Sequence, residues 1–161
     1  MSKDISWLKM CRAGAEIMVR CSKAQYFAYL IDNDGRVRSC GYNGAPAGMI
    51  NCTDGGCPRA INNVPSGTTY NYGDGLCVSN HAEMNAIVGV DRKILNESTL
   101  YVNGICCFGC AKEITGAGIK KVVGYLPKNK NMPIDYDETS KFFKQANVEW
   151  LLYLEEEDID K

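Results

Sequence analysis

Histidine is almost absent from this sequence, and two further absences narrow what the chain can be. The 161 residues contain one histidine, and 18 lysines and arginines are matched by 19 acidic residues. A chain without a basic excess is not typical of a nucleic-acid binder, so a small ligand is favoured over a polymer. No apolar run approaches the roughly 18 residues of a membrane-spanning helix, and residues 1–10 lack the order of a signal peptide. We therefore expect a cytoplasmic protein that binds neither membrane nor nucleic acid.

Cysteine, by contrast, is unusually frequent. Nine cysteines in a reducing compartment are more typical of thiols and metal ligands than of disulfides, and an odd number cannot pair completely. The 45% apolar and 23% charged residues are ordinary for a globular protein, and the length suits one folded unit. We expect a single domain over residues 1–154, followed by an acidic tail at 155–161.

The hydrophobic pattern predicts an α/β domain. Apolar residues at helical spacing predict a helix over 2–21, and two apolar stretches around an Asn33-Asp34-Gly35 turn predict a hairpin over 26–42. Residues 51–80 carry no periodicity, which in a compact domain indicates a functional or clamped loop. The remaining elements are expected as helices over 81–90, 107–115 and 137–145 and strands over 99–102, 121–125 and 148–153. Because helices separate the later strands, we expect these strands to run parallel.

The single histidine lies in a pattern that predicts a catalytic zinc site. His81 is followed two residues later by Glu83, and Cys107 and Cys110 follow at CxxC spacing. Zinc prefers His nitrogen and Cys sulfur, and three protein ligands leave a fourth position for water. The two cysteines lie at the expected start of a helix, where the dipole lowers thiol pKa values and favours ligation. Zinc lowers the pKa of bound water to about 7, and Glu83 is the adjacent carboxylate that would carry protons.

Each part of this pattern also has a plainer interpretation. A lone histidine on a helix is more often structural, and a CxxC after a strand is also typical of a thioredoxin-like redox pair. A redox pair, however, leaves His81 and Glu83 without a role. A further alternative is a regulatory protein that descends from a zinc enzyme, is stabilised by zinc and has no catalytic activity, although such a protein has no reason to retain Glu83. The combination of HxE with CxxC therefore favours a hydrolytic enzyme.

The same residues resemble the zinc nucleobase deaminases, for which HxE followed by CxxC is the signature. Longer motifs resemble the deoxycytidylate (dCMP) deaminase family. The family's turn is matched by GYNGAPAG at 41–48, its ligand helix by HAEMNA at 81–86 and one of its strands by TLYV at 99–102. Cys77-Val78 and the segments 110–112 and 117–121 also fit. The resemblance spans roughly residues 2–153.

This resemblance implies a three-layer α/β/α cytidine-deaminase-like fold with a mixed five-stranded sheet. It implies hydrolysis of dCMP to dUMP and ammonia, feeding thymidylate synthesis, with dCTP or a 5-substituted dCMP as alternative substrates. It also implies a homo-oligomer, often a hexamer, that responds to dCTP and dTTP, with Mg²⁺ accompanying such a triphosphate. The residues implied are His81, Cys107 and Cys110 for zinc, Glu83 for proton transfer, Asn43, Ala82 and Tyr125 for substrate, and Arg92 for effector or subunit contact.

The chain departs from the family where substrate contacts are expected. Tyr26-Phe27 stand in place of Val-Gly, Asn103 in place of Thr or Ser, and Cys106 in place of the proline before the first ligand cysteine. We expect the large Phe27 ring to reshape the pocket wall, and Cys106 to pack in the core rather than bind metal. The candidate cations for the substrate's phosphate are Lys23, Arg92 and Lys128.

The loop over 51–80 predicts a second metal. It carries Cys52, Cys57 and Cys77, and Cys21 at the end of the first expected helix is a fourth thiol. Four cysteines are a typical structural zinc site, and by resemblance some relatives bind a second metal near the positions matching Cys21 and Cys52. Buried thiols without metal are the alternative.

Overall fold

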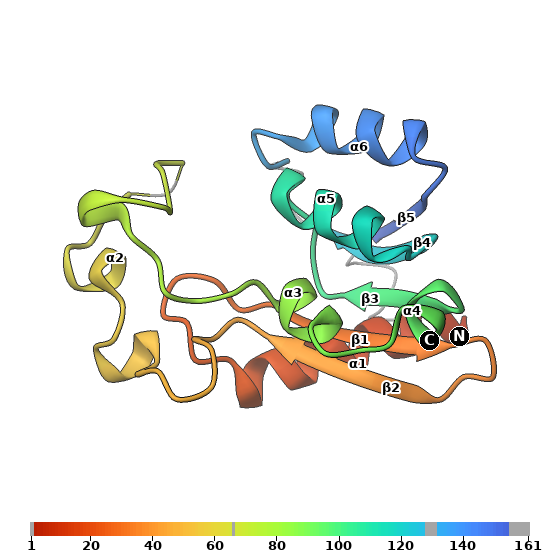
Figure 1. Cartoon of the computed structure of the whole chain (residues 1–161), viewed down its shortest axis with the longest axis horizontal. Coiled ribbons are helices and arrows are strands. Elements are labelled where there is room, and N and C mark those ends of the chain that lie inside the picture. Colours follow the sequence, from red (N-terminus) through yellow and green to blue (C-terminus); the bar gives the residue numbers. More distant parts are fainter. Residues whose placement is uncertain (1, 66, 128–131, 155–161) are drawn as a thin grey trace.

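The computed structural model describes residues 2–65, 67–127 and 132–154. They form three layers, a mixed sheet with helices on each of its two faces (Figure 1). The five strands, in the order β2-β1-β3-β4-β5, are β1 (Phe27–Asp32), β2 (Val37–Tyr42), β3 (Ser98–Val102), β4 (Lys121–Leu126) and β5 (Glu149–Leu154). β1 pairs antiparallel with β2 and β3, whereas β4 pairs in parallel with both β3 and β5. The expected hairpin and mixed sheet are confirmed. The expected acidic tail lies outside the described residues.

Helices cover both faces of the sheet. They are α1 (Lys3–Met18), α3 (Ala82–Ile87), α4 (Arg92–Asn96), α5 (Phe108–Ala117) and α6 (Tyr136–Gln145), while the short α2 (Pro58–Ile61) lies away from the sheet (Figure 1). Ser2, which precedes α1, caps this helix because its hydroxyl accepts a hydrogen bond from the Ile5 amide. The expected helix over 81–90 is shorter than the sequence pattern indicated, because it ends at Ile87 and a short turn separates it from α4. Each helix in the described ranges is too short or too polar to cross a bilayer.

The core is divided by the sheet into two apolar layers. On one face, α1 packs on the sheet through a cluster of Leu8, Cys11, Ile31, Tyr101, Val123 and Tyr125. On the other, α3, α5 and α6 pack on a larger cluster that includes Leu30, Ala82, Leu100, Ile114, Val122 and Phe143. Because side chains alternate along a strand, odd-numbered residues of β1 face α1 and even-numbered ones face α3.

β2 and α3 approach closely where two of the family-like motifs meet. A Cβ at Gly41 would lie 2.3 Å from both the Ala82 carbonyl oxygen and the Ala86 nitrogen, so only glycine allows this contact. Asn85 adds a hydrogen bond from its Nδ2 to the Tyr42 carbonyl at 2.8 Å. The GYNG turn and the start of α3 are thereby held against each other.

The chain between β2 and α3 forms a long loop that stands beyond the strand ends, together with α2 (Figure 1). Besides α2 it contains two 3₁₀ turns, Cys52–Asp54 and Gly73–Gly75. Backbone hydrogen bonds attach it at both ends, from the Thr53 amide to the Arg20 carbonyl at 3.2 Å and from the Asn80 amide to the Gly44 carbonyl at 2.9 Å. The loop is therefore built on the end of α1 and on the GYNG turn.

Candidate active site

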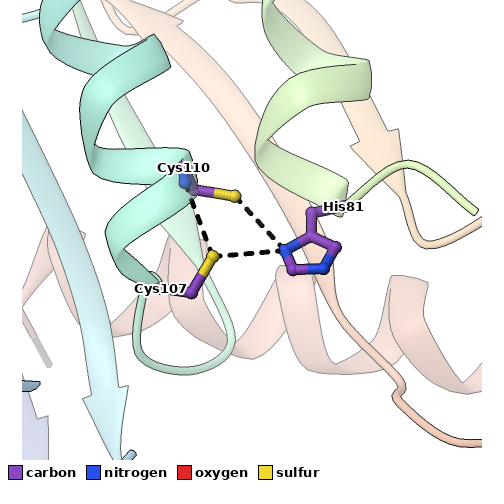
Figure 2. A group of neighbouring side chains, drawn as sticks. All are labelled: His81, Cys107 and Cys110. Carbon is purple, nitrogen blue, oxygen red and sulfur yellow. Dashed lines mark hydrogen bonds between the residues drawn. The ribbon is translucent and has the colours of Figure 1, made fainter. Parts of the chain in front are cut away.

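Three side chains from the starts of two helices converge on one point, as Figure 2 shows. His81 is the residue that precedes α3, Cys107 precedes α5, and Cys110 lies in the first turn of α5. The His81 Nδ1 lies 3.5 Å from the Cys107 Sγ and 3.3 Å from the Cys110 Sγ. Among the described residues, this is the only group of three or more His, Cys, Asp or Glu side chains whose ligand atoms all lie within 4.8 Å of one another.

The distances within this trio fit zinc. Zn–N bonds of about 2.05 Å and Zn–S bonds of about 2.3 Å at tetrahedral angles separate nitrogen from sulfur by about 3.5 Å. The observed separations of 3.5 and 3.3 Å match that value. The trio also leaves one of four tetrahedral positions open, as catalytic zinc requires. Because His81 joins the two cysteines, the structure favours a metal centre over a thioredoxin-like redox pair.

The pKa values of the two cysteines of the trio are shifted in opposite directions. Hydrogen bonds with Cys110 and His81 lower the pKa of Cys107 to about 4, although burial opposes this. The hydrogen bond with Cys107, together with burial, raises the pKa of Cys110. The Cys107 hydrogen bond likewise raises the pKa of His81. A divalent cation replaces the protons held by such a cluster, because its ligands must be deprotonated.

Glu83 lies beside the trio without belonging to it. Its side chain is in the first turn of α3, is 4% exposed, and has a pKa raised by burial. Cys106 is fully buried and packs in the core as expected, where burial and the nearby negative charge of Glu83 raise the pKa of its thiol. A carboxyl group with a raised pKa is suited to accept and return a proton near neutral pH.

His81, Cys107 and Glu83 line a cavity of about 390 Å³. A cavity of this size suits a small molecule. Other side chains in its wall are Lys23, Tyr26, Asn43, Arg59, Tyr70 and Ser79. The Ser79 Oγ is buried and has no hydrogen-bond partner within the described ranges, so it is a candidate contact for a polar ligand.

Asn43 and Ala82, both expected at the substrate, are hydrogen-bonded to each other. The Ala82 amide donates to the Asn43 Oδ1 at 2.9 Å, and the Asn43 Nδ2 donates to the Ala24 carbonyl at 3.3 Å. Asn43 is 4% exposed and lines the cavity. Its carboxamide therefore links the GYNG turn to the start of α3 as well as facing the ligand space.

The structure does not bring Tyr125 or Phe27 to this cavity. Tyr125 packs under α1, with the Arg12 guanidinium carbon 4.8 Å from its ring centroid. Phe27 packs against Ala15 of α1, so the expectation that it reshapes the pocket wall is wrong. The reason is the alternation along β1, since Phe27 faces α1 whereas Tyr26, one residue earlier, lies in the cavity wall.

Two other expected residues also lie away from the cavity. Arg92 is exposed at the start of α4. Asn103 anchors the start of β1, where its Oδ1 accepts from the Phe27 amide at 2.6 Å and its Nδ2 donates to the Gln25 carbonyl at 3.0 Å. Of the candidate cations for phosphate, Lys23 lines the cavity, while Lys128 lies outside the described residues.

Arg59 and Tyr70 are wall residues that the sequence pattern did not indicate. Both come from the loop between β2 and α3, where the absence of periodicity removes the usual signal for burial. A third contribution comes from the segment before α6, where Pro133 lines the cavity. The next turn holds α5 in place, because the Asp135 Oδ2 accepts from the Phe108 amide at 2.6 Å.

Comparison with known proteins agrees with this geometry. Residues 1–126 match the family model described as the cytidine and deoxycytidylate deaminase zinc-binding region. A deoxycytidylate deaminase of Mycobacterium phage D29 is 41% identical over 104 residues, covering 64% of this chain and 79% of the relative. One of Schizosaccharomyces pombe is 32% identical over 158 residues, covering 98% of this chain but only 46% of the relative.

The fold has solved counterparts. A dCMP deaminase from the cyanophage S-TIM5, solved in complex with dCMP and dUMP, superposes with a TM-score of 0.64 at 22% identity, covering 95% of this chain and 99% of that one. At this identity the likeness concerns the fold alone. The sequence match extends over most of the chain and includes His81, Cys107 and Cys110. The chain belongs to the cytidine and deoxycytidylate deaminase family.

Proposed function

We propose that this chain is a zinc-dependent hydrolytic deaminase that converts dCMP to dUMP and ammonia. The observation that carries the proposal is the convergence of one imidazole, two thiols and a buried carboxylate, three of which line a cavity of nucleotide size. Several relatives bear the name deoxycytidylate deaminase, and a neighbour of the same fold binds dCMP and dUMP. These names support dCMP over other 4-aminopyrimidines.

In this mechanism Glu83 moves the protons. Bound zinc would be held by His81, Cys107 and Cys110 and would supply a water-derived nucleophile at neutral pH. Glu83 accepts a proton from the attacking water and delivers it to N3 of the pyrimidine as the C4–O bond forms. Glu83 then takes the proton of the new C4 hydroxyl and delivers it to the amine at C4, the C4–N bond breaks as the C4 carbonyl forms, and ammonia leaves. Water and dCMP are thereby converted to dUMP and ammonia.

The substrate contacts belong to the cavity wall. Asn43 would bind the sugar and the Ala82 amide the pyrimidine edge, which requires the Asn43 carboxamide to turn away from Ala82. The Ser79 hydroxyl is a free polar contact within the described ranges. Lys23, whose Nζ donates to the Val64 carbonyl at 3.0 Å, is the candidate cation for the phosphate. A charge-assisted contact of this type favours a nucleotide over a nucleoside.

We expect dCMP to be the preferred substrate of the zinc-loaded protein. Its kcat/KM should exceed those of CMP and deoxycytidine by at least about tenfold. The pocket should exclude the 2′-hydroxyl of CMP sterically, and deoxycytidine lacks the phosphate and so the charge-assisted hydrogen bonds to it. The measurement is ammonia release from dCMP, CMP, dCTP, cytidine, deoxycytidine and 5-methyl-dCMP. A higher kcat/KM for dCTP or 5-methyl-dCMP would move the assignment to that nucleotide. Absence of turnover with all six would support the non-catalytic regulatory alternative.

A second, structural zinc is proposed for Cys21, Cys52, Cys57 and Cys77, which all line the same cavity. The Sγ atoms of Cys57 and Cys77 lie 3.9 Å apart, close to the separation of about 3.8 Å for two sulfurs on tetrahedral zinc. Burial opposes ionisation of Cys57, yet hydrogen bonds that include those with Cys77 and Cys52 leave its pKa below the ordinary value. Cys52 also contacts the Ser22 Oγ at 3.2 Å. No three of the four thiols, which all belong to described residues, lie within 4.8 Å of one another, so side chains besides the Cys57–Cys77 pair have to turn to share one ion with it.

Two zinc ions per chain are therefore expected in freshly purified, chelator-free protein. Cys57→Ser should reduce this to one and lower the melting temperature, because the metal clamps the loop between β2 and α3. Cys40→Ser, a change at an exposed cysteine, is the matched control and should keep both ions. Elemental analysis and calorimetric melting provide the measurements, and a single zinc in the unaltered protein would contradict the second site.

Regulation and assembly are also proposed on the family resemblance. We propose a homo-oligomer, hexameric as in many relatives, activated by dCTP and inhibited by dTTP, with Mg²⁺ accompanying the triphosphate. Arg92 supports this proposal through its exposure on α4, away from the cavity. Light scattering and the ammonia assay in the presence of each nucleotide would test it, and a monomer indifferent to both nucleotides would refute it.

A further inference from the structure

Arg59 is a buried cation in the cavity wall whose partners are all neutral. Its side chain is 3% exposed. Nη1 donates to the Thr68 hydroxyl at 3.0 Å and to the carbonyls of Thr69 and Gly75 at 2.9 and 3.3 Å, and Nη2 donates to the Pro65 carbonyl at 2.5 Å. No ion pair to Arg59 occurs in the part of the chain that the structure describes. A buried guanidinium is costly without such acceptors, so these bonds hold it at one defined position.

The acceptors belong to one segment, residues 67–75 with the preceding Pro65, and we call residues 67–75 the Tyr70 loop. The loop closes tightly on Arg59. A Cβ at Gly75 would lie 2.5 Å from the Thr69 carbonyl oxygen and 3.4 Å from the Arg59 Nη1, so this closure requires glycine. Because residues 68, 69 and 75 all accept from the same guanidinium, the Arg59 side chain joins the two ends of the loop.

Arg59 also sets the position of the Tyr70 ring. Its guanidinium carbon lies 4.3 Å from the ring centroid, within the range of a cation–π contact. The Tyr70 ring then meets the His81 ring edge-on, with centroids 6.4 Å apart and an interplanar angle of 89°. Tyr70 lines the cavity and is 47% exposed. Its ring therefore has free surface beside a ligand of the proposed metal.

We propose that Arg59 is a positioning residue and that Tyr70, held by it, is the aromatic wall against which the nucleotide binds. This inference rests on the proposed function, because a pyrimidine with C4 at the trio lies beside His81 and hence beside Tyr70. An aromatic ring there contributes by stacking on the base or sugar. The unpaired charge of Arg59 adds a favourable field for a substrate that carries a phosphate.

The test compares four variants on zinc-loaded protein. Tyr70→Ala is expected to raise the KM for dCMP about tenfold while kcat changes less than about twofold, and Tyr70→Phe, which keeps the ring, should behave like the unaltered protein. Arg59→Lys keeps the charge but loses the planar fork, and it should raise KM as Tyr70→Ala does. Tyr72→Ala is the control, because Tyr72 is 71% exposed in the same loop and lies outside the cavity lining.

The Arg59→Lys and Tyr70→Ala changes should be non-additive when combined, since both act on one ring. Calorimetric titration measures the affinity for dUMP, which depends on the same aromatic wall but involves no turnover. Zinc content and melting temperature report whether each variant is folded. An unchanged KM and an unchanged dUMP affinity in Tyr70→Ala would overturn the inference. If the unaltered protein binds dUMP but does not release ammonia from dCMP, the proposed function fails, whereas weaker dUMP binding by Tyr70→Ala still supports the wall.

Discussion

Glu83→Gln is expected to keep its full zinc content and to lose about 10²- to 10⁴-fold of its turnover. Glutamine has the size of glutamate and retains a hydrogen-bonding oxygen, but it cannot accept a proton from water or return one to the pyrimidine. Glu83 is outside the group formed by His81, Cys107 and Cys110, so the metal should remain bound. Because one side chain serves more than one proton transfer, we expect the loss to lie toward the upper end of that range.

The measurements are zinc per chain by elemental analysis and single-turnover conversion of dCMP to dUMP. Glu113→Gln is the matched control, because Glu113 is an exposed glutamate on α5 and its loss of charge should leave turnover unchanged. A zinc-replete Glu83→Gln protein with near-normal turnover would exclude Glu83 as the proton carrier. Zinc loss in this variant would instead place Glu83 among the ligands.

The features that are best predicted here are those whose residues lie close together along the sequence. Cys107 and Cys110 lie three residues apart at the start of a helix, so any α/β arrangement that begins α5 there puts their sulfurs on one face. His81 is distant in sequence, and its convergence with them was predicted from the ligands that a catalytic zinc needs, since it is the one histidine of the chain. The hairpin β1–β2 and strands β3, β4 and β5 also follow from local pattern, because each is a short apolar run between turn residues.

The cavity wall was predictable only in part, and Tyr26 and Phe27 show why. The two residues are adjacent, and a strand sends neighbours to opposite faces, so the outcome depends on register rather than on composition. Phe27 packs with Ala15 and Val19 on the α1 side of the sheet, and Tyr26 lines the cavity. Nothing in the order Tyr-Phe-Ala indicates which of the two faces which layer.

The loop between β2 and α3 was harder still. Arg59 follows Cys57-Pro58 at the start of α2, and a charged residue in a polar, aperiodic stretch is normally expected at the surface. Its burial depends on acceptors contributed by Thr68, Thr69 and Gly75. Such tertiary hydrogen bonds have no periodicity in sequence, so neither the buried cation nor its contact with Tyr70 could be anticipated.

Cys107→Ser is expected to remove the catalytic zinc and reduce turnover to background. The Cys107 thiol is the group of the trio that ionises most readily, since hydrogen bonds with Cys110 and His81 lower its pKa to about 4. A serine hydroxyl does not ionise near neutral pH and is a poor ligand for zinc, which prefers thiolate sulfur. Because metal affinity contributes to folding free energy, the melting temperature should fall as well.

His81→Ala should behave in the same way, since it deletes the nitrogen that lies 3.5 and 3.3 Å from the two sulfurs.

The decisive comparison is the pattern of zinc loss among cysteine variants. If the two proposed sites are independent, Cys107→Ser and Cys57→Ser should each lose one equivalent of zinc. Only Cys107→Ser should lose turnover through the loss of its zinc. Cys40→Ser, the exposed control, should lose neither. Full zinc content and activity in Cys107→Ser would exclude the trio as the catalytic metal site. No other group in the described residues brings three such ligand atoms within 4.8 Å, so the proposed zinc chemistry would then have no site of this kind.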